Sequence, residues 1–190
     1  MKNVMKKNSF KLFTGIILTI IPYIIFAFPL IAKSDNKRLL IGLELFPSFL
    51  ASDHNIKNKK ENDQLTIVVV YQYNKQIADD MASRLQSLKK IRGIPFHVMV
   101  KSVYEIQSIH NQIIAGVFVS ESMISLEAII KQSIVNQFIV FSPFEGDIEK
   151  GATGGIYITE KIVPYLNMST LHKANIQMKS FFLRVAKKYE

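Results

Sequence analysis

The segment LTIVVVY (residues 65–71) restricts the fold more than any other stretch of this chain. Five of its seven residues are β-branched, polar segments flank it, and it lacks the apolar-polar alternation of a half-exposed strand. Such a run is typical of a strand buried on both faces, which occurs where helices cover both sides of a parallel sheet. We therefore expect a layered α/β domain with this strand in its interior.

Strand-like and helix-like segments alternate after this run. Three further apolar runs of strand length lie at residues 94–100, 113–119 and 136–142. The segments between them predict helices at residues 74–93, 101–110 and 120–134. The helix predicted at 74–93 has Asn74 available as N-cap and Gly93 as its end. The helix predicted at 120–134 can begin at Ser120 or Ser122.

Different patterns occur before and after this alternating region. Residues 36–53 have apolar positions at helical spacing, so we expect an amphipathic helix that Pro47 kinks or divides in two. Residues 54–64 are polar without periodicity and predict a solvated loop. Residues 156–168 predict an antiparallel hairpin, in which Pro164 favours an edge strand. Two helical pieces, STLHKA and QMKSFFLRVAKKYE, complete the chain.

The predicted fold class is thus α/β, with an open, mostly parallel sheet and helices on both faces, followed by a C-terminal antiparallel hairpin and a terminal helix. Residues 34–190 are long enough to form one such domain.

The first 33 residues predict export from the cytoplasm. Four lysines precede residues 12–32, which carry no charge, and no acidic residue occurs before Asp35. Two outcomes are open. The length suits a retained membrane anchor, whereas Pro22 and Pro29, with a small residue at Ala27 or Ala32, suit a cleaved signal peptide. Both place residues 34–190 in the periplasm, either free or held at the inner membrane.

Composition excludes several function classes. Five of the 24 basic residues lie in residues 1–33 and none of the 15 acidic ones does, so the exported part carries a formal charge of only +4 and we expect no nucleic-acid partner. There is no cysteine, and the four histidines lack the HExxH spacing of zinc enzymes. A GxSxG nucleophile motif and a GxxxxGK[ST] phosphate loop are also missing. We therefore expect a protein that is not an enzyme and has no metal or cofactor.

Candidate binding residues follow from the sheet. In open parallel sheets, ligands bind beyond the carboxyl ends of the strands. The polar residues expected there are Tyr71, Gln72, Asn74, Ser120, Glu121, Ser142, Glu145 and Asp147. The last three belong to FSPFEGDIEKGATGG (residues 141–155), for which two interpretations stay open. It is a binding loop, or a turn whose prolines and glycines let the chain change from parallel to antiparallel pairing.

A resemblance adds to this interpretation. Its residues are a Gly-Gly pair before a hairpin, the strand that ends in Leu166-Asn167, a helix with Leu171 and Ala174, and the closing FFLRVAKKYE with Leu183 and Ala186. With these features and the helix RLLIGLELFPSFL, residues 36–190 resemble the YfiR-like family of periplasmic proteins, whose best-known member holds an inner-membrane diguanylate cyclase inactive. That member uses cysteines in redox control, so the cysteine-free chain departs from it.

Two functions are then expected. The first is a non-enzymatic periplasmic regulator that binds an inner-membrane signalling protein, which the resemblance suggests is a diguanylate cyclase. The alternative is a receptor that binds a small-molecule ligand at the strand ends and presents it to a transporter or sensor. A homodimer is compatible with both.

Overall fold

The computed structural model describes residues 35–106, 112–122 and 124–190, and it divides the chain into two compact units, Met1–Lys37 and Arg38–Glu190. The predicted targeting segment (residues 1–33) lies outside the described residues. No helix within the described part is long and apolar enough to span a bilayer. The account below concerns the second unit.

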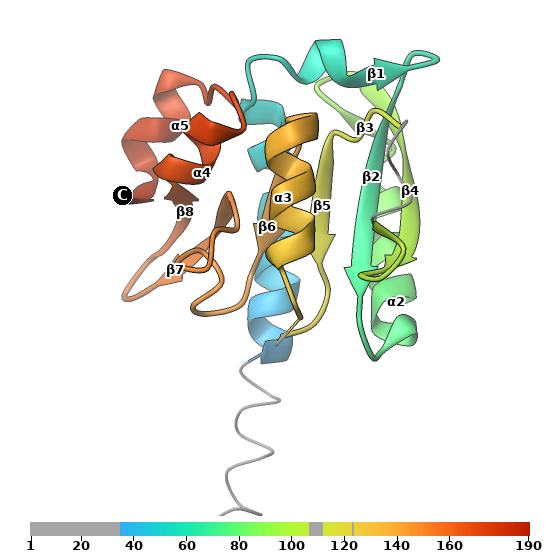
Figure 1. The fold of residues 1–190 in the computed structure, drawn as a ribbon, viewed down its shortest axis with the longest axis horizontal. Coiled ribbons are helices and arrows are strands. Elements are labelled where there is room, and N and C mark those ends of the chain that lie inside the picture. The colour runs from blue at the N-terminus through green and yellow to red at the C-terminus, as the bar shows by residue number, and fades with distance from the viewer. Residues whose placement is uncertain (1–34, 107–111, 123) are drawn as a thin grey trace, which may run out of the picture. The chain divides into compact units, whose positions relative to one another are not determined.

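Nine strands form one mixed sheet in the order β3-β4-β2-β5-β6-β7-β8-β9, with β1 paired to β2 (Figure 1). Pairing is parallel from β4 through β7 and again between β8 and β9, and antiparallel elsewhere. The strands are β1 (Lys60–Glu61), β2 (Gln64–Tyr71), β3 (Lys90–Ile91), β4 (Ile94–Ser102), β5 (Gly116–Val119), β6 (Ile139–Ser142), β7 (Gly154–Ile158), β8 (Ile162–Asn167) and β9 (Lys187–Tyr189).

Helices cover both faces of the sheet, so the predicted fold class is confirmed (Figure 1). The first helix is described over residues 35–52, and α3 lies across the opposite face from it (Figure 1). The other helices are η1 (Ile56–Lys59, 3-10), α2 (Lys75–Gln86), α3 (Glu127–Asn136), α4 (Met168–Lys173) and α5 (Ser180–Val185).

The core forms around β2 and four aromatic rings. Residues 65–70 of β2 are fully or almost fully buried, which confirms the interior strand that the sequence predicts. Phe46 and Phe49 of the first helix pack on Phe141 of β6 at ring-centroid distances of 5.4 and 4.7 Å, and Phe118 of β5 stacks on Phe141 at 5.7 Å. Edge and offset contacts of this kind stabilise a core beyond the area that they bury. They fix the first helix over β5, β6 and β7.

Several element boundaries differ from the prediction. Helix α2 ends at Gln86 and does not extend to Gly93. Residues 90–93 instead belong to a β3–β4 hairpin, whose two-residue turn is Arg92 and Gly93, both with positive φ (52° and 81°). The expected helix at 101–110 is also wrong in part, since β4 continues to Ser102 and residues 107–111 lie outside the described residues. The polar segment 54–64 contains η1 and β1 instead of being only a loop.

The predicted N-caps Ser120 and Ser122 and the predicted limits of two strands also differ from the structure. Ser120 does not open a helix, because its hydroxyl donates to the Val70 carbonyl at 2.7 Å and α3 begins only at Glu127. Ser122 lies before that helix too. The strands expected at 113–119 and 136–142 are shorter, with Asn136 still in α3.

Proline positions and the C-terminus give the remaining corrections. The first helix continues through Pro47 as one element. Strand β8 is not an edge strand, because β9 pairs with it beyond Pro164, at Tyr165–Asn167. The final predicted helix stops at Val185, and Lys187–Tyr189 form this strand instead.

The glycine pair explains the long loop after β6. Strand β7 pairs parallel to β6, with Phe141 beside Gly154 and Ser142 beside Gly155. Residues 143–153 therefore leave β6 at its carboxyl end and turn back so that β7 begins beside Phe141. The change to antiparallel pairing comes one strand later, between β7 and β8. A Cβ at position 155 would collide with the Ser142 carbonyl oxygen, and one at position 154 would lie 2.5 Å from the Phe49 ring.

Gly155→Ala should therefore lower the free energy of unfolding by about 3 kcal/mol, because the collision is with backbone that cannot rotate away. Gly93→Ala is the control, since its Cβ meets nothing within 4 Å and only the positive φ is penalised, at about 1 kcal/mol. Urea unfolding measures both. Equal losses would contradict the steric explanation.

Candidate functional site

The candidate residues at the ends of β2 and β5 do come together. Glu121 Oε1 accepts hydrogen bonds from three consecutive backbone N–H groups, those of Gln72, Tyr73 (2.7 Å) and Asn74 (3.3 Å). The Gln72 side-chain oxygen in turn accepts from the Ser125 N–H at 3.1 Å. These residues thus lie at the carboxyl ends of β2 and β5, where the sequence places them, and their role in binding stays a prediction.

These groups are already occupied by one another. The Glu121 carboxylate uses the N–H groups that a bound anion would need at the carboxyl end of a parallel strand. Asn74 accepts from the Ile77 N–H at 3.1 Å and caps α2, and the Ser120 hydroxyl is bonded to Val70. Tyr71 is the last residue of β2, half-buried, and its carbonyl accepts from the Val103 N–H at 2.8 Å. Their observed role is to hold the β2–α2 and β5–α3 connections.

Two of the three candidates in the loop after β6 are internal. Ser142 and Asp147 are 0% and 2% exposed, and the Ser142 hydroxyl donates to Asp147 Oδ2 at 2.6 Å. Lys150 Nζ lies 3.0 Å from Asp147 Oδ1, and the Phe144 N–H donates to Ser142 Oγ at 3.3 Å. The Asp147 carboxylate therefore ties the start and the end of the loop together.

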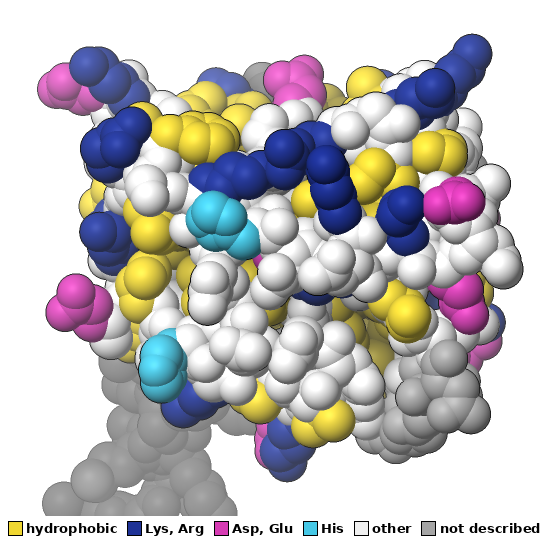
Figure 2. All heavy atoms as spheres, turned by 90° about the horizontal axis from the view of Figure 1, so that it is seen from above, with side chains coloured by type: hydrophobic (Ala, Val, Ile, Leu, Met, Phe, Trp, Pro, Cys, Tyr) yellow, Lys and Arg dark blue, Asp and Glu magenta, His cyan; other side chains and the backbone are white. Residues whose placement is uncertain are grey.

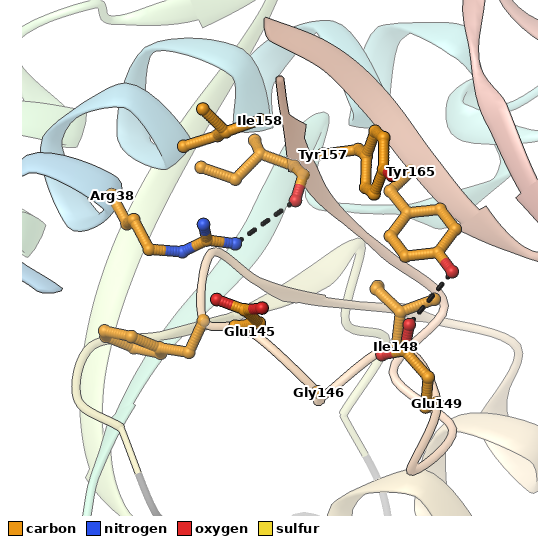
Figure 3. A pocket seen from close by; sticks show the side chains of 10 residues that line it. Arg38, Glu145, Gly146, Ile148, Glu149, Tyr157, Ile158 and Tyr165 are labelled. Atoms are coloured by element: carbon orange, nitrogen blue, oxygen red, sulfur yellow. Dashed lines mark hydrogen bonds between the residues drawn. The ribbon is translucent and has the colours of Figure 1, made fainter. Parts of the chain in front are cut away.

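Glu145, the third, lines a concave pocket of about 110 Å³ (Figure 3). The pocket joins segments that are far apart in the chain: the first helix, the loop after β6, and the β7–β8 hairpin. Its lining residues are Arg38, Phe144, Glu145, Gly146, Ile148, Glu149, Ile156, Tyr157, Ile158 and Tyr165.

Arg38 is the fixed cation of this pocket. Its Nε donates to the Pro143 carbonyl at 2.8 Å and its Nη2 to the Ile156 carbonyl at 3.4 Å, so one guanidinium bridges the loop and β7. A guanidinium has five N–H donors, and no further hydrogen bond or ion pair of Arg38 is found within the described part of the chain. Donors therefore remain to meet an anion.

Carboxylates and tyrosines form the other side. Tyr165 donates its hydroxyl to Glu149 Oε1 at 2.9 Å, and its ring lies 5.5 Å from that of Tyr157. Burial and the hydrogen bond to Glu149 raise the pKa of Tyr165 to about 12, so the hydroxyl keeps its proton at physiological pH and continues to donate. Lys187 Nζ lies 3.3 Å from the centre of the Tyr157 ring and braces it from the β9 side.

Sequence reasoning missed most of this pocket. The sequence-based candidates do not include Arg38, Glu149, Tyr157 or Tyr165. These residues lie far apart in the chain, and only the packing of the first helix, the loop after β6 and the β7–β8 hairpin brings them together. One signal was present for Arg38. It lies four residues before Gly42 and eight before Phe46, and is therefore on the buried stripe of the helix, where an unpaired cation needs a partner.

A second concavity, of about 340 Å³ and mainly apolar, lies between α4, α5 and the end of the first helix. It is lined by His54, Met168, Leu171, His172, Ile176, Gln177, Met178 and Leu183. Across the described residues, no group of three or more histidine, aspartate or glutamate side chains is arranged to hold a metal ion.

No family model and no curated protein matches the chain. Solved structures of similar fold include the following two. One is a conserved domain protein from Vibrio cholerae O1 biovar El Tor (TM-score 0.52, 14% identity, 66% of this chain and 54% of that one). The other is an ABC domain from Streptococcus pneumoniae in complex with L-Trp (TM-score 0.51, 8% identity, 74% and 61%). The chain thus spans less than two thirds of either protein, and these identities show a shared fold alone.

Asp147 and Glu145 should respond differently to alanine substitution. Asp147→Ala removes the buried acceptor of Ser142 and Lys150, and should lower the free energy of unfolding by about 2–3 kcal/mol. Glu145→Ala changes an exposed side chain and should stay within about 0.5 kcal/mol. Thermal and urea unfolding measure the difference. A stable Asp147→Ala variant would show that the carboxylate does not hold the loop.

Proposed function

We propose that this chain is a non-enzymatic, extracytoplasmic ligand-binding module that recognises a small polar molecule in the pocket between Arg38 and Glu145. The observation that carries the proposal is the Arg38 guanidinium, which the fold fixes with two backbone hydrogen bonds and which lines a concave surface. A few fixed polar groups beside apolar walls in a concavity are a common mark of a ligand site.

The pocket has the composition that this function needs. Phe144, Ile148 and Ile158 supply apolar walls, while Arg38, Glu145 and Glu149 supply a few charged groups. The loop that carries the acids is held by buried hydrogen bonds to Asp147 and to the Ile148 carbonyl, so little conformational entropy is lost when a ligand binds.

The fold comparison supports the same class. The Streptococcus pneumoniae ABC domain, a chain of similar fold, was solved in complex with L-Trp. For the present chain, this likeness in fold supports a receptor-type function. We therefore propose that the module presents its ligand to a transporter or sensor.

The N-terminal sequence supports a location outside the cytoplasm, since a lysine-rich start precedes 21 uncharged residues. A ligand-binding module in the periplasm acts by changing the state of a membrane protein. It does so only if ligand binding alters its affinity for one state of that partner. The resemblance to YfiR-like proteins suggests a signalling protein, such as a diguanylate cyclase, as the partner.

A specific surface favours this regulatory role as a second candidate function. Burial lowers the pKa of Lys179, and the neighbouring charges of Arg92 and Lys57 lower it further, so three cations lie close together. The nearby acid Asp53 is already paired with Lys59 at 2.6 Å. Lysine and arginine side chains gather on this end of the molecule (Figure 2). Lys179 directly follows Met178 of the wide apolar concavity, so the surface fits an acidic partner segment with an apolar side chain.

Native mass spectrometry of the protein, purified without denaturation from the periplasmic or membrane fraction, should detect a bound small molecule. Glu145→Arg, which fills the pocket with a second guanidinium, should abolish this adduct, whereas Glu61→Arg in the β1–β2 hairpin should keep it. Thermal unfolding checks that both variants are folded. An adduct that survives Glu145→Arg unchanged would place the ligand elsewhere and contradict the proposed site.

The partner surface makes a separate prediction. A photo-crosslinking residue at Asn58, beside Lys57, should capture a membrane signalling protein, whose affinity for the purified chain should then fall with salt. Lys57→Glu together with Arg92→Glu should weaken that binding at least tenfold, and Lys161→Glu with Lys188→Glu, also exposed, should not. Binding that is insensitive to both salt and the first pair would contradict an electrostatic contact.

A further inference from the structure

We propose that the Arg38 pocket binds the zwitterionic headgroup of an α-amino acid, with the ligand carboxylate on Arg38 and the ligand ammonium between Glu145 and Glu149. This inference rests on the proposed ligand-binding function and names the chemical class of the ligand. It follows from the arrangement of charge, the shape of the pocket and its volume.

The cationic side is built for a carboxylate. Arg38 has its Nε and one Nη2 hydrogen bonded to the Pro143 and Ile156 carbonyls, which fixes the plane of the guanidinium. The Nη1 edge carries no hydrogen bond within the described residues and belongs to a side chain that lines the pocket. A planar guanidinium of fixed orientation binds a carboxylate through two parallel N–H···O bonds.

The anionic side lies on the loop across from it. Glu145 and Glu149 line the same pocket, and Figure 3 shows the Glu145 carboxylate directed toward Arg38. Even so, Arg38 and Glu145 form no ion pair within 4 Å. Glu149 is oriented by the Tyr165 hydroxyl on Oε1, which leaves Oε2 to accept from a ligand. An ammonium group has three donors and can meet both acids.

Charge balance favours a ligand with both charges. One fixed cation and two acids line the pocket, so a simple carboxylate bound to Arg38 would be repelled by Glu145 and Glu149. A simple amine would be repelled by Arg38. A molecule that carries a carboxylate and an ammonium on one carbon satisfies both sides at once.

The volume of the pocket limits which part of the ligand can enter it. A dry cavity of about 150 Å³ accommodates benzene, which has six heavy atoms. By the same ratio the present pocket of about 110 Å³ suits about four to five heavy atoms, and an amino-acid headgroup with its α-carbon has five. The side chain of a larger amino acid would extend past Ile158, which is 37% exposed at the rim.

Isothermal titration of the full chain, stripped of bound ligand by dialysis, with three matched probes tests this inference. The probes are L-phenylalanine, 3-phenylpropionate, which lacks the ammonium, and phenethylamine, which lacks the carboxylate. L-Phenylalanine should bind at least tenfold more tightly than either. Equal affinity for 3-phenylpropionate, or no binding of L-phenylalanine, overturns the inference.

Two variants test the contacts to the ligand headgroup separately from the location of the binding site. Glu145→Gln should weaken L-phenylalanine at least tenfold and strengthen 3-phenylpropionate, because one source of repulsion is removed. Glu61→Gln, at a distant hairpin, is the control. An unchanged affinity of Glu145→Gln for L-phenylalanine overturns the inference. If the probes fail but native mass spectrometry finds another molecule that Glu145→Arg displaces, the proposed function stands and only the ligand class is wrong.

Discussion

The parallel pairing of β7 with β6 is the constraint on which the rest of the structure depends. It requires two glycines in succession, since side chains at positions 154 and 155 would meet the Phe49 ring and the Ser142 carbonyl. It also forces residues 143–153 to form a return loop of eleven residues over the end of the sheet. The pocket exists because this loop, the β7–β8 hairpin and the first helix are brought to one place by that pairing.

Buried hydrogen bonds hold the return loop in place. The Thr153 hydroxyl accepts from the Val140 N–H at 2.7 Å and donates to the Val140 carbonyl at 2.9 Å, so it completes the β6 ladder where the loop would interrupt it. Asn167 Nδ2 donates to the Ile148 carbonyl at 2.8 Å. Because these polar groups are buried and paired, the Glu145 and Glu149 side chains project from a fixed backbone. In the function proposed above, this lowers the entropic cost of binding a ligand.

The sequence predicted the layers well because burial leaves a direct pattern. The β-branched run at 65–71 identified the central strand, and helical spacing located α2, α3 and the first helix. The misses share a physical cause. Short strands such as β3 and β9 consist of charged or mixed residues, Lys90-Ile91 and Lys187–Tyr189. Their strand conformation depends on a neighbouring strand and not on local propensity.

The candidate site was predicted less well. Glu121 lies at the carboxyl end of β5, as the sequence indicates, but its three hydrogen bonds to the loop after β2 could not be predicted without the strand register. Arg38 was missed because its partners are the distant carbonyls of Pro143 and Ile156.

We propose that the fold holds Arg38 in one orientation and leaves some of its donors available to a ligand. The side-chain Nε–H signal of Arg38 in ¹H–¹⁵N spectra tests it most directly, with the exposed Arg184 as internal reference. Without ligand, the Arg38 Nε–H should exchange with solvent at least tenfold more slowly than that of Arg184, because it is bonded to the Pro143 carbonyl. Its Nη signals should shift when ligand is added. An Arg38 signal that exchanges as fast as that of Arg184 and stays in place with ligand would contradict the account.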